Sequence, residues 1–282
     1  MAKTLVTHKN PDLDAITAMW LFVRFDQSRF GDAHLEFTPA GETYKNQVVD
    51  SDSEIVHVDN GRGRFDHHMP GGYETCASKL VYEHLVTEGL VSPSDRALKE
   101  MVAFSLDIDR FVDFSWPEPF ATRHSYTLHE VIPALHSLQV MDNEAVARYV
   151  FVYLDGVYQR LKQLYAAQDE IVQGTSFEWA RGRGLALNST NNEVVKTAQK
   201  SGYLLVIQRH TENGHMRIKA VPEHGIDLTP LYDKILLTDM PEQWFLHPSK
   251  QMLINGWDKA GYKKPTNLSL DEVVRLVKQV YK

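Results

Sequence analysis

The chain of 282 residues has little cysteine: Cys76 is its single thiol. One thiol excludes an internal disulfide framework and a zinc site built from several thiolates, and it fits a reducing compartment such as the cytoplasm. No apolar run approaches the roughly 20 residues needed to span a bilayer, and no secretory leader is visible at the start. Internal repeats and low-complexity tracts are also missing. We therefore expect a cytoplasmic protein that does not enter a membrane.

Basic side chains are scarce in the first part of the chain. Residues 1–169 hold 15 Lys and Arg against 25 Asp and Glu, whereas residues 170–282 hold 15 against 12, and the formal net charge is −7. Duplex binding needs many cations that neutralise phosphates, so stable duplex binding is not expected. An acidic excess is also what a metal site contributes when its ions are not counted. Ordinary surface variation explains the asymmetry equally well.

The first residues predict a strand followed by a helix. Residues 3–8 are a largely apolar run that ends at His8, and residues 15–25 carry apolar side chains at helical spacing. The polar stretch His-Lys-Asn-Pro-Asp-Leu-Asp, residues 8–14, therefore occupies a strand-to-helix turn. In open parallel sheets, ligands bind at this end of the strands.

Further strands and helices alternate along the first half of the chain. Strands are expected at residues 34–39 and 54–58, and helices at 75–85 and 95–106. Such alternation indicates an α/β domain with a mainly parallel sheet flanked by helices. We assign this domain to residues 1–141.

A long helical pattern covers residues 142–173 and predicts a linker helix. The second domain, residues 174–282, is expected to be a smaller α/β domain that binds substrate. Its strands are predicted at 185–188, 203–209 and 215–221, with a hairpin turn at Glu212-Asn213-Gly214 and a final amphipathic helix at 268–281.

Two polar clusters and one isolated aspartate follow strand-like segments. The first cluster is residues 8–14, the aspartate follows the strand at 54–58, and the second cluster is Asp-His-His at 66–68. Carboxylates and imidazoles of this kind suit two divalent cations and phosphate chemistry. The ligands expected from the residues alone are His8, Asp12, Asp14, Asp59 and His67, with Asp59 as a bridge and His68 directed at substrate.

Each of these side chains also has an ordinary structural explanation. Asp12 could cap the helix that starts near Leu13, Asp59 could be a turn residue, and residues 66–68 could form a polar loop. Their occurrence together, in this order and each after a strand, argues against coincidence.

The ordered set resembles the DHH phosphoesterase superfamily, named for its Asp-His-His signature. The resemblance implies His8 and Asp12 on one metal, Asp14 and His67 on the other, and Asp59 shared between them. It places His68 toward the phosphate and gives Asp66 the task of holding the imidazoles. The expected catalytic residues are therefore His68, Asp59 and Asp66, and the expected cofactor is manganese, two ions per chain, with magnesium or cobalt able to occupy the same ligands.

The family has one more metal-binding aspartate further along the chain. Asp107 and Asp109 both qualify, and Asp107 is slightly favoured. The short interval between Asp59 and Asp66, with Arg64-Phe65 before the signature, is most similar to the branch that contains the melanocyte-proliferating-gene exonucleases.

Residues 203–222 and 244–258 resemble the C-terminal region of that branch more loosely. A lysine and a single glycine stand here where the branch is richer in glycine. The implied role of this domain is to grip the part of the substrate that does not react. The expected substrate contacts are His68, His247, Ser249, Lys250, Asn255 and Gly256.

These observations predict a hydrolase that cleaves phosphodiester bonds of short single-stranded oligonucleotides or small nucleotides, using water activated by two metals. The alternatives are a phosphatase or pyrophosphatase for a small phosphate compound, and a catalytically silent regulatory module that binds metal. Metal-assisted deacylation usually prefers a mononuclear zinc site. The sequence does not fix the oligomeric state, and a homodimer is compatible with it.

Overall fold

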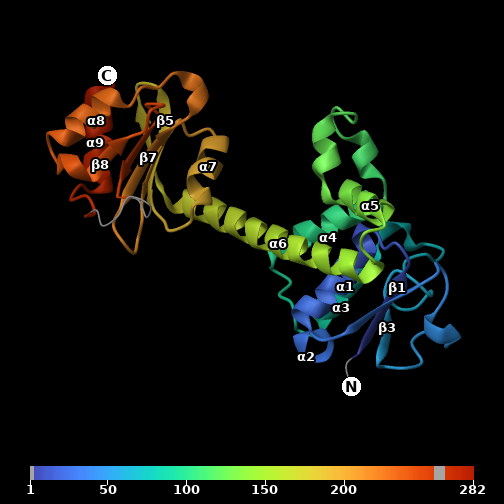
Figure 1. Ribbon diagram of the computed structural model, residues 1–282. Coiled ribbons are helices and arrows are strands. Elements are labelled where there is room, and N and C mark those ends of the chain that lie inside the picture. Colours follow the sequence, from blue (N-terminus) through green and yellow to red (C-terminus); the bar gives the residue numbers. More distant parts are fainter. Residues whose placement is uncertain (1–2, 257–263) are drawn as a thin grey trace. The chain divides into compact units, whose positions relative to one another are not determined.

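The computed structural model describes residues 3–256 and 264–282 (Figure 1). The chain divides into two compact units, Met1–Arg160 and Leu161–Lys282. The long helix α6 (Asn143–Gln173) contributes residues to both units and matches the predicted linker helix. The expected domain boundaries, at 141 and 174, stay a prediction.

The first unit contains a three-stranded sheet in which β1 lies between β2 and β3, and all pairings are parallel. Leu5 and Val6 of β1 are fully buried, as expected of a central strand covered on both faces. The predicted mainly parallel sheet is therefore confirmed. Its strands are β1 (Thr4–His8), β2 (His34–Thr38) and β3 (Ile55–His57).

Helix α1 follows β1 and forms the centre of the first unit, where it packs against α3 and α4. Its side chains from Leu13 to Phe22 are all buried, because sheet and helices enclose it. The predicted helices are confirmed in this unit. Its helices are α1 (Leu13–Phe25), α2 (Gln27–Phe30), α3 (Ala77–Thr87), α4 (Arg96–Asp109) and α5 (Leu128–Leu138).

Helix α5 is absent from the sequence expectation. Pro133 lies inside it, and an internal proline normally argues against a helix because it removes a backbone donor. Between α4 and α5 the chain forms two short 3₁₀ segments, η3 (Val112–Ser115) and η4 (Thr122–Tyr126). Residues 110–138 thus form a helical insertion in the first unit.

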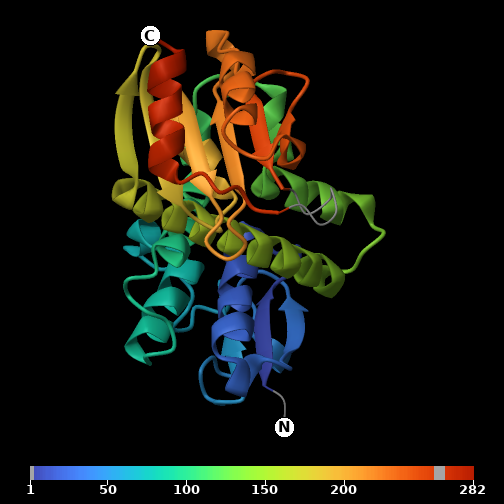
Figure 2. The ribbon, with the colours of Figure 1, turned by 90° about the vertical axis from the view of Figure 1, so that its left-hand side faces the viewer.

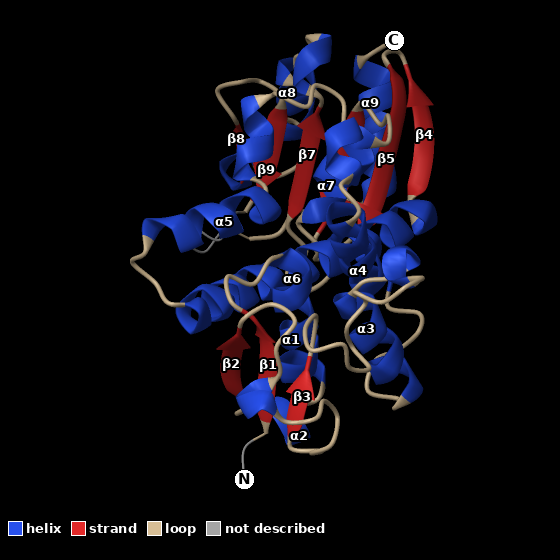
Figure 3. Cartoon of the chain, turned by 90° about the vertical axis from the view of Figure 1, so that its right-hand side faces the viewer, coloured by secondary structure: helices blue, strands red, loops and turns tan. Residues whose placement is uncertain are grey.

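The second unit is built on a six-stranded sheet of order β4-β5-β6-β7-β9-β8 (Figure 3). The β5–β6 pair is parallel and the other pairs are antiparallel. The predicted hairpin joins β6 to β7, where Gly214 N donates to His210 O. The strands are β4 (Thr175–Trp179), β5 (Gly182–Asn188), β6 (Leu205–Arg209), β7 (Met216–Ala220), β8 (Trp244–Leu246) and β9 (Met252–Asn255).

Helices cover both faces of this sheet. One apolar cluster joins α7 (Glu193–Lys200) and the last turns of α6 to β5 and β6. A larger cluster joins α8 (Thr229–Leu236) and α9 (Leu270–Val280) to the opposite face (Figure 2). A capping box between Ser269 and Glu272 starts α9, the predicted last helix. The second unit is therefore the α/β domain expected from the sequence.

Two further features concern the described residues. None of their helices combines the length and the apolar character that crossing a bilayer requires. The segment predicted at 244–258 corresponds to β8, β9 and Gly256, and its last two residues, Trp257 and Asp258, lie outside the described ranges.

Candidate metal centre

The parallel pairing of β1 with β3 brings the first two candidate ligands together. Val6 lies opposite His57, so Asp59, two residues further on, reaches the level of His8 at the end of β1. His8 Nε2 lies 3.4 Å from Asp59 Oδ2, and the Asp59 side chain is only 2% exposed. The site therefore begins at the carboxyl ends of two adjacent strands, where the sequence placed it.

The turn from β1 into α1 supplies two aspartates with different partners. Asp12 is the N-cap of α1, and its Oδ1 accepts a 3.0 Å hydrogen bond from Ala15 N. The capping explanation of Asp12 is thus correct, but it leaves Oδ2 without a recorded hydrogen bond. An oxygen of Asp12 lies within 4.8 Å of ligand atoms of His8 and Asp59. One carboxylate can therefore cap the helix and face the site.

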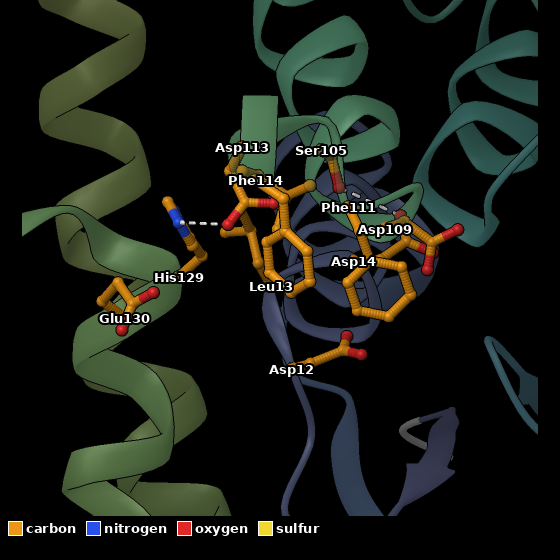
Figure 4. A pocket seen from close by; sticks show the side chains of 11 residues that line it. Asp12, Leu13, Asp14, Ser105, Asp109, Phe111, Asp113, Phe114, His129 and Glu130 are labelled. Carbon is orange, nitrogen blue, oxygen red and sulfur yellow. Dashed lines mark hydrogen bonds and ion pairs between the residues drawn. The ribbon is translucent and has the colours of Figure 1, made fainter. Parts of the chain in front are cut away.

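Asp14 is held by two other helices. Its carboxylate accepts hydrogen bonds from Ala77 N (2.6 Å) and Ser78 N (3.0 Å), at the start of α3, and from the Ser105 hydroxyl of α4 (3.0 Å; Figure 4). The side chain is buried, and the amides of a helix N-terminus favour a negative charge. Asp14 is consequently fixed in place by three hydrogen bonds.

The Asp-His-His signature lies in a loop anchored to both the core and the site. Asp59 N donates to Phe65 O, and the buried Phe65 ring packs at 5.2 Å from Phe22 of α1. His67 Nε2 then lies 3.2 Å from Asp59 Oδ1 and 3.7 Å from Asp109 Oδ1. The loop thus carries His67 inward to the carboxylates.

Asp66 acts on His68. Its Oδ1 accepts from His68 N at 3.1 Å and lies 2.8 Å from His68 Nδ1, while its Oδ2 accepts from Arg62 N at 2.6 Å. The His68 side chain is 61% exposed and therefore accessible to a ligand. Among the described residues, no recorded contact joins Asp66 to His67, so Asp66 orients one imidazole of the pair.

The two aspartates at the end of α4 differ in position. Asp109 faces His67, and a carboxylate oxygen of Asp109 groups with ligand atoms of Asp14 and His67 within 4.8 Å. Asp107 is exposed and belongs to no such group in the described part of the chain. The geometry therefore favours Asp109 over Asp107, the residue slightly preferred from sequence.

Asp59 and His67 connect three ligand groups. His8, Asp12 and Asp59 form one group, Asp14, His67 and Asp109 form another, and Asp59, His67 and His68 form a group that joins the two. The opposite oxygens of Asp59 face the imidazoles of the two groups, Oδ2 toward His8 and Oδ1 toward His67. This arrangement matches the pairing that the family resemblance implies, although the assignment of ligands stays a prediction.

The close packing of these groups shifts their pKa values. Desolvation by the neighbouring groups, reinforced by the charge of Asp59, raises the pKa of Asp12 to about 6, although the residue is exposed by its accessible surface. Burial also raises the pKa of Asp109 to about 6, against the attraction of His67. Such shifts mean that the carboxylates lie too close together for all of them to ionise easily.

The imidazoles respond in the opposite way. The interaction with Asp59 raises the pKa of His67 to about 9. Burial lowers the pKa of His8, but Asp59, the Lys9 carbonyl and Asp12 together raise it to about 9. Burial would raise the pKa of Asp59, yet its two histidines hold it below the ordinary value. Positive charge is therefore strongly favoured at this place.

The residues fit a divalent metal. Asp59 Oδ1 and His67 Nε2 are buried without a hydrogen-bond partner, although buried polar atoms normally have one. A cation between them would satisfy both and would replace the protons that the imidazoles otherwise hold. Carboxylate oxygens with imidazole nitrogens suit manganese, magnesium or cobalt better than a thiolate-binding metal.

The predicted substrate contacts of the second unit have structural partners. His247 Nδ1 lies 2.9 Å from Ser249 Oγ, and Lys250 Nζ lies 3.5 Å from Asp227 Oδ2. Asn255 is fully buried; it donates to Gln243 O and accepts from Thr266 N. These contacts give Asn255 a structural role, because its side chain joins β9 to the segments around Gln243 and Thr266. The roles of His247, Ser249 and Lys250 toward a substrate stay predictions.

Gly256 has a geometric requirement for glycine. Its φ is +60°, and an added Cβ would lie 2.0 Å from Nδ1 of His215. Gly256 and Arg217 line a cavity of about 180 Å³ in the second unit. The contact of Gly256 with substrate stays a prediction.

Sequence reasoning missed residues that support the site. Ser105 lies four residues before Asp109 on α4, and this i, i+4 spacing was an available signal. Asn60 follows Asp59 directly and is buried. Its Oδ1 accepts a hydrogen bond from Gly41 N, and its Nδ2 donates one to Thr38 Oγ1. Asn60 thereby links the loop after β2 to the loop after β3, a contact that no local pattern reveals.

Several solved structures are similar to this chain, whereas no family model and no curated protein matches it. One is RecJ of Thermus thermophilus in complex with Mg²⁺, with 14% identity over 99% of this chain and 49% of that chain and a TM-score of 0.33. Another is the DHH domain of a member of a family of ribosomal proteins, with 12% identity over 98% and 86% of the two chains and a TM-score of 0.33. An exopolyphosphatase-related protein from Bacteroides fragilis shows 13% identity over 99% and 91% and a TM-score of 0.26.

These structures include a DHH domain, the type of protein named in the sequence resemblance. The chain spans about half the length of Thermus thermophilus RecJ. The structures named above do not distinguish the melanocyte-proliferating-gene branch. The mixed α/β fold with its parallel sheet is that expected of a DHH-like protein.

Proposed function

We propose that the chain is a metal-dependent phosphoric ester hydrolase of the DHH type. Its substrates would be phosphodiesters of short single-stranded oligonucleotides or small nucleotides. The observation that carries the proposal is the position of Asp59, whose two carboxylate oxygens face the imidazoles of two separate ligand groups, at 3.4 and 3.2 Å. A carboxylate shared between two ligand sets suits a site for two metals, the arrangement that many phosphatases and nucleases use.

The residues that would hold the metals are those of the two groups. His8, Asp12 and Asp59 would hold one ion, and Asp14, His67 and Asp109 the other, with Asp59 between them. When bound, a pair of divalent cations stabilises both the attacking and the leaving oxygen of an in-line displacement. Manganese is the proposed metal, two ions per chain.

The remaining signature residues would act on the substrate. His68 is exposed and is aimed by Asp66, so its imidazole can donate a hydrogen bond to a phosphate oxygen. Asp66 keeps the ring in place through its bonds to Nδ1 and to the His68 amide. His247, Ser249 and Lys250 of the second unit are proposed to contact the part of the substrate that does not react.

The test is hydrolysis by the purified chain after chelation and reloading with manganese. A dinucleotide, bis(p-nitrophenyl) phosphate and pyrophosphate should be compared, and bound metal should be counted by mass spectrometry. We expect two metals per chain, cleavage of the diesters, and loss of cleavage in Asp59→Asn and His67→Ala. Full manganese-dependent activity in either variant would contradict the assignment of these residues to the metal site.

The same experiment separates the alternatives. Cleavage of pyrophosphate but not of the diesters would indicate a phosphatase for small phosphate compounds. Binding of manganese without cleavage of any compound in a broad panel would indicate a regulatory module. A single metal per chain would favour a mononuclear hydrolase instead.

A further inference from the structure

A cavity of about 270 Å³ opens beside the candidate metal ligands in the first unit (Figure 4). Asp12, Asp14 and Asp109 lie on one side of it. The rings of Phe111 and Phe114 line it as well, from the first turn of the helical insertion that follows α4. The cavity therefore combines an acidic wall, where cations would bind, with an aromatic wall, and Asp113, His129 and Glu130 belong to the rest of its lining.

The two phenylalanine rings are unusually exposed. Phe111 is 66% exposed and Phe114 is 73% exposed, and their ring centroids lie 5.5 Å apart. Single exposed apolar residues are common, but two neighbouring aromatic rings in a cavity next to a polar site are typical of a binding surface. The rings thus offer apolar faces that no other described part of the first unit covers.

The backbone holds Phe111 in this position at an energetic cost. Its φ is +58°, a left-handed conformation that is an outlier for a bulky residue. Phe111 comes two residues after Asp109, so this turn folds the chain back immediately after the candidate ligand and places the ring between the carboxylates and Phe114 (Figure 4). Strained backbone of this kind persists where the surrounding structure requires it and clusters at functional sites.

We propose that Phe111 and Phe114 form a stacking subsite for the base of a nucleotide whose phosphate lies at the metal ligands. This inference rests on the proposed function and narrows it to substrates that carry a nucleobase. A ligand that fits both walls must join an anion, which cations on the acidic wall would hold, to a flat apolar ring. A nucleoside phosphate has both parts, whereas pyrophosphate and polyphosphate lack the ring.

The chemistry of stacking also predicts what the subsite would not do. Every base has a π face, so stacking on an aromatic side chain is tolerant of sequence. The subsite would therefore distinguish nucleotides from base-free phosphates without selecting one base. Phe111 and Phe114 would determine the preference for nucleotides and would not contact the reacting atoms.

A matched pair of ligands tests the subsite apart from catalysis. Binding of AMP and of ribose 5-phosphate to the manganese-loaded chain should be measured by calorimetry, because the two differ by the base alone. We expect AMP to bind about 10- to 100-fold more tightly, the range that stacking of one base supplies. In the double variant Phe111→Ala with Phe114→Ala, the two ligands should bind with similar affinity.

Phe120→Ala is the matched control. Phe120 lies in the same insertion, is 98% exposed and does not line the cavity. This variant should keep the preference for AMP, and circular dichroism should show that all variants are folded. Equal affinity of the wild type for both ligands, or a preference that survives in the double variant, would overturn the subsite.

Kinetics separate this inference from the proposed function. The double variant should raise KM for a dinucleotide by about 10- to 100-fold and leave kcat nearly unchanged. A wild type that cleaves no phosphodiester contradicts the proposed function, whereas the comparison of AMP with ribose 5-phosphate still decides on the subsite. A wild type that cleaves dinucleotides but binds the two ligands equally contradicts the subsite alone.

Discussion

His67 Nε2 lies 3.2 Å from Asp59 Oδ1, and neither atom has a hydrogen-bond partner of good geometry although both are buried. Attraction without a directed hydrogen bond is the relationship expected of two ligands that share a cation. Unpaired buried polar atoms are costly, so an ion bound by both atoms would remove that cost.

The two aspartates of α4 should respond differently to neutralisation. Asp109→Asn removes a carboxylate that groups with Asp14 and His67, so manganese affinity and activity should fall by at least about 100-fold, beyond the effect usual for an outer partner. Asp107→Asn changes an exposed side chain two residues away and should leave both unchanged. Calorimetric titration with manganese and hydrolysis rates measure the difference. The opposite ranking of the two variants would restore Asp107 as the ligand.

Asp66→Asn should weaken catalysis more than metal binding. The variant loses the charge that holds His68 Nδ1 at 2.8 Å, and a lost orienting partner typically costs 10- to 100-fold in activity. Metal content, measured by mass spectrometry, should stay at the wild-type value. Asp50→Asn is the control, because Asp50 accepts from Arg64 N in the same loop system and belongs to none of the ligand groups formed by the described residues. If both variants lowered activity equally, Asp66 would only hold the loop in place and would not orient His68.

Ser105→Ala tests the support of Asp14. The change removes one of three hydrogen bonds to a buried carboxylate and should lower the free energy of unfolding by about 1 kcal/mol. Manganese affinity should fall by about 10- to 100-fold, since Asp14 is then held less firmly. Ser137→Ala, which removes a bond to the Pro133 carbonyl on an exposed helix face, should leave the affinity unchanged. Urea denaturation and calorimetry give the two quantities, and an unchanged affinity in Ser105→Ala would contradict the proposed coupling.

The metal-free protein should lose stability as the pH rises from 6.5 to 9. The pKa values of His8 and His67 are raised to about 9 in the folded state, so the folded protein binds more protons than the unfolded chain in this range. Their contribution is complete below pH 6.5 and disappears as the pH passes through about 9. Metal binding requires neutral imidazoles, so the rise in Tm on adding manganese should grow over the same range.

Thermal unfolding with chelator and with manganese measures both trends. His67→Gln should flatten the decline of the chelated protein, whereas His34→Gln changes an exposed histidine of β2 and should keep the wild-type profile. A chelated protein whose Tm rises steadily between pH 6.5 and 9 would show that these histidines are not held charged by Asp59.

Gly256→Ala should destabilise the second unit more than Gly202→Ala does. Both glycines have positive φ, but an added Cβ at Gly202 meets nothing within 4 Å, whereas at Gly256 it would lie 2.0 Å from His215 Nδ1. Gly202→Ala therefore measures the backbone cost, of order 1 kcal/mol, and the excess in Gly256→Ala measures the close approach of His215. Chemical denaturation gives the two values, and equal losses would mean that His215 moves aside without cost.

The sequence was sufficient for elements whose patterns are local. Strand β1, helix α1 and the turn between them follow from apolar spacing and from Pro11, and the parallel order of β1 and β3 follows from alternation of strands with helices. Because parallel strands align their carboxyl ends, His8 and Asp59 could be expected to meet. The candidate site was predictable to this extent.

Other features depend on contacts that no local pattern records. Helix α5 contains Pro133 and is held to the first unit partly through His136, whose ring contacts the Pro11 carbonyl. The choice between Asp107 and Asp109 depends on where α4 ends and which face it presents to His67. From sequence alone, Phe111 would be assigned to the core, because hydrophobicity does not distinguish a buried ring from a ring on a binding surface.

The three hydrogen bonds to Asp14 have a consequence for the evolution of this chain. Its carboxylate joins the first turn of α1 to the first amides of α3 and to a hydroxyl of α4, so a single candidate metal ligand holds three helices together. Replacing it would disturb the architecture together with the chemistry. A descendant that keeps this fold without the candidate metal site should therefore lose His67 or Asp109 first and retain Asp14 for its structural role alone.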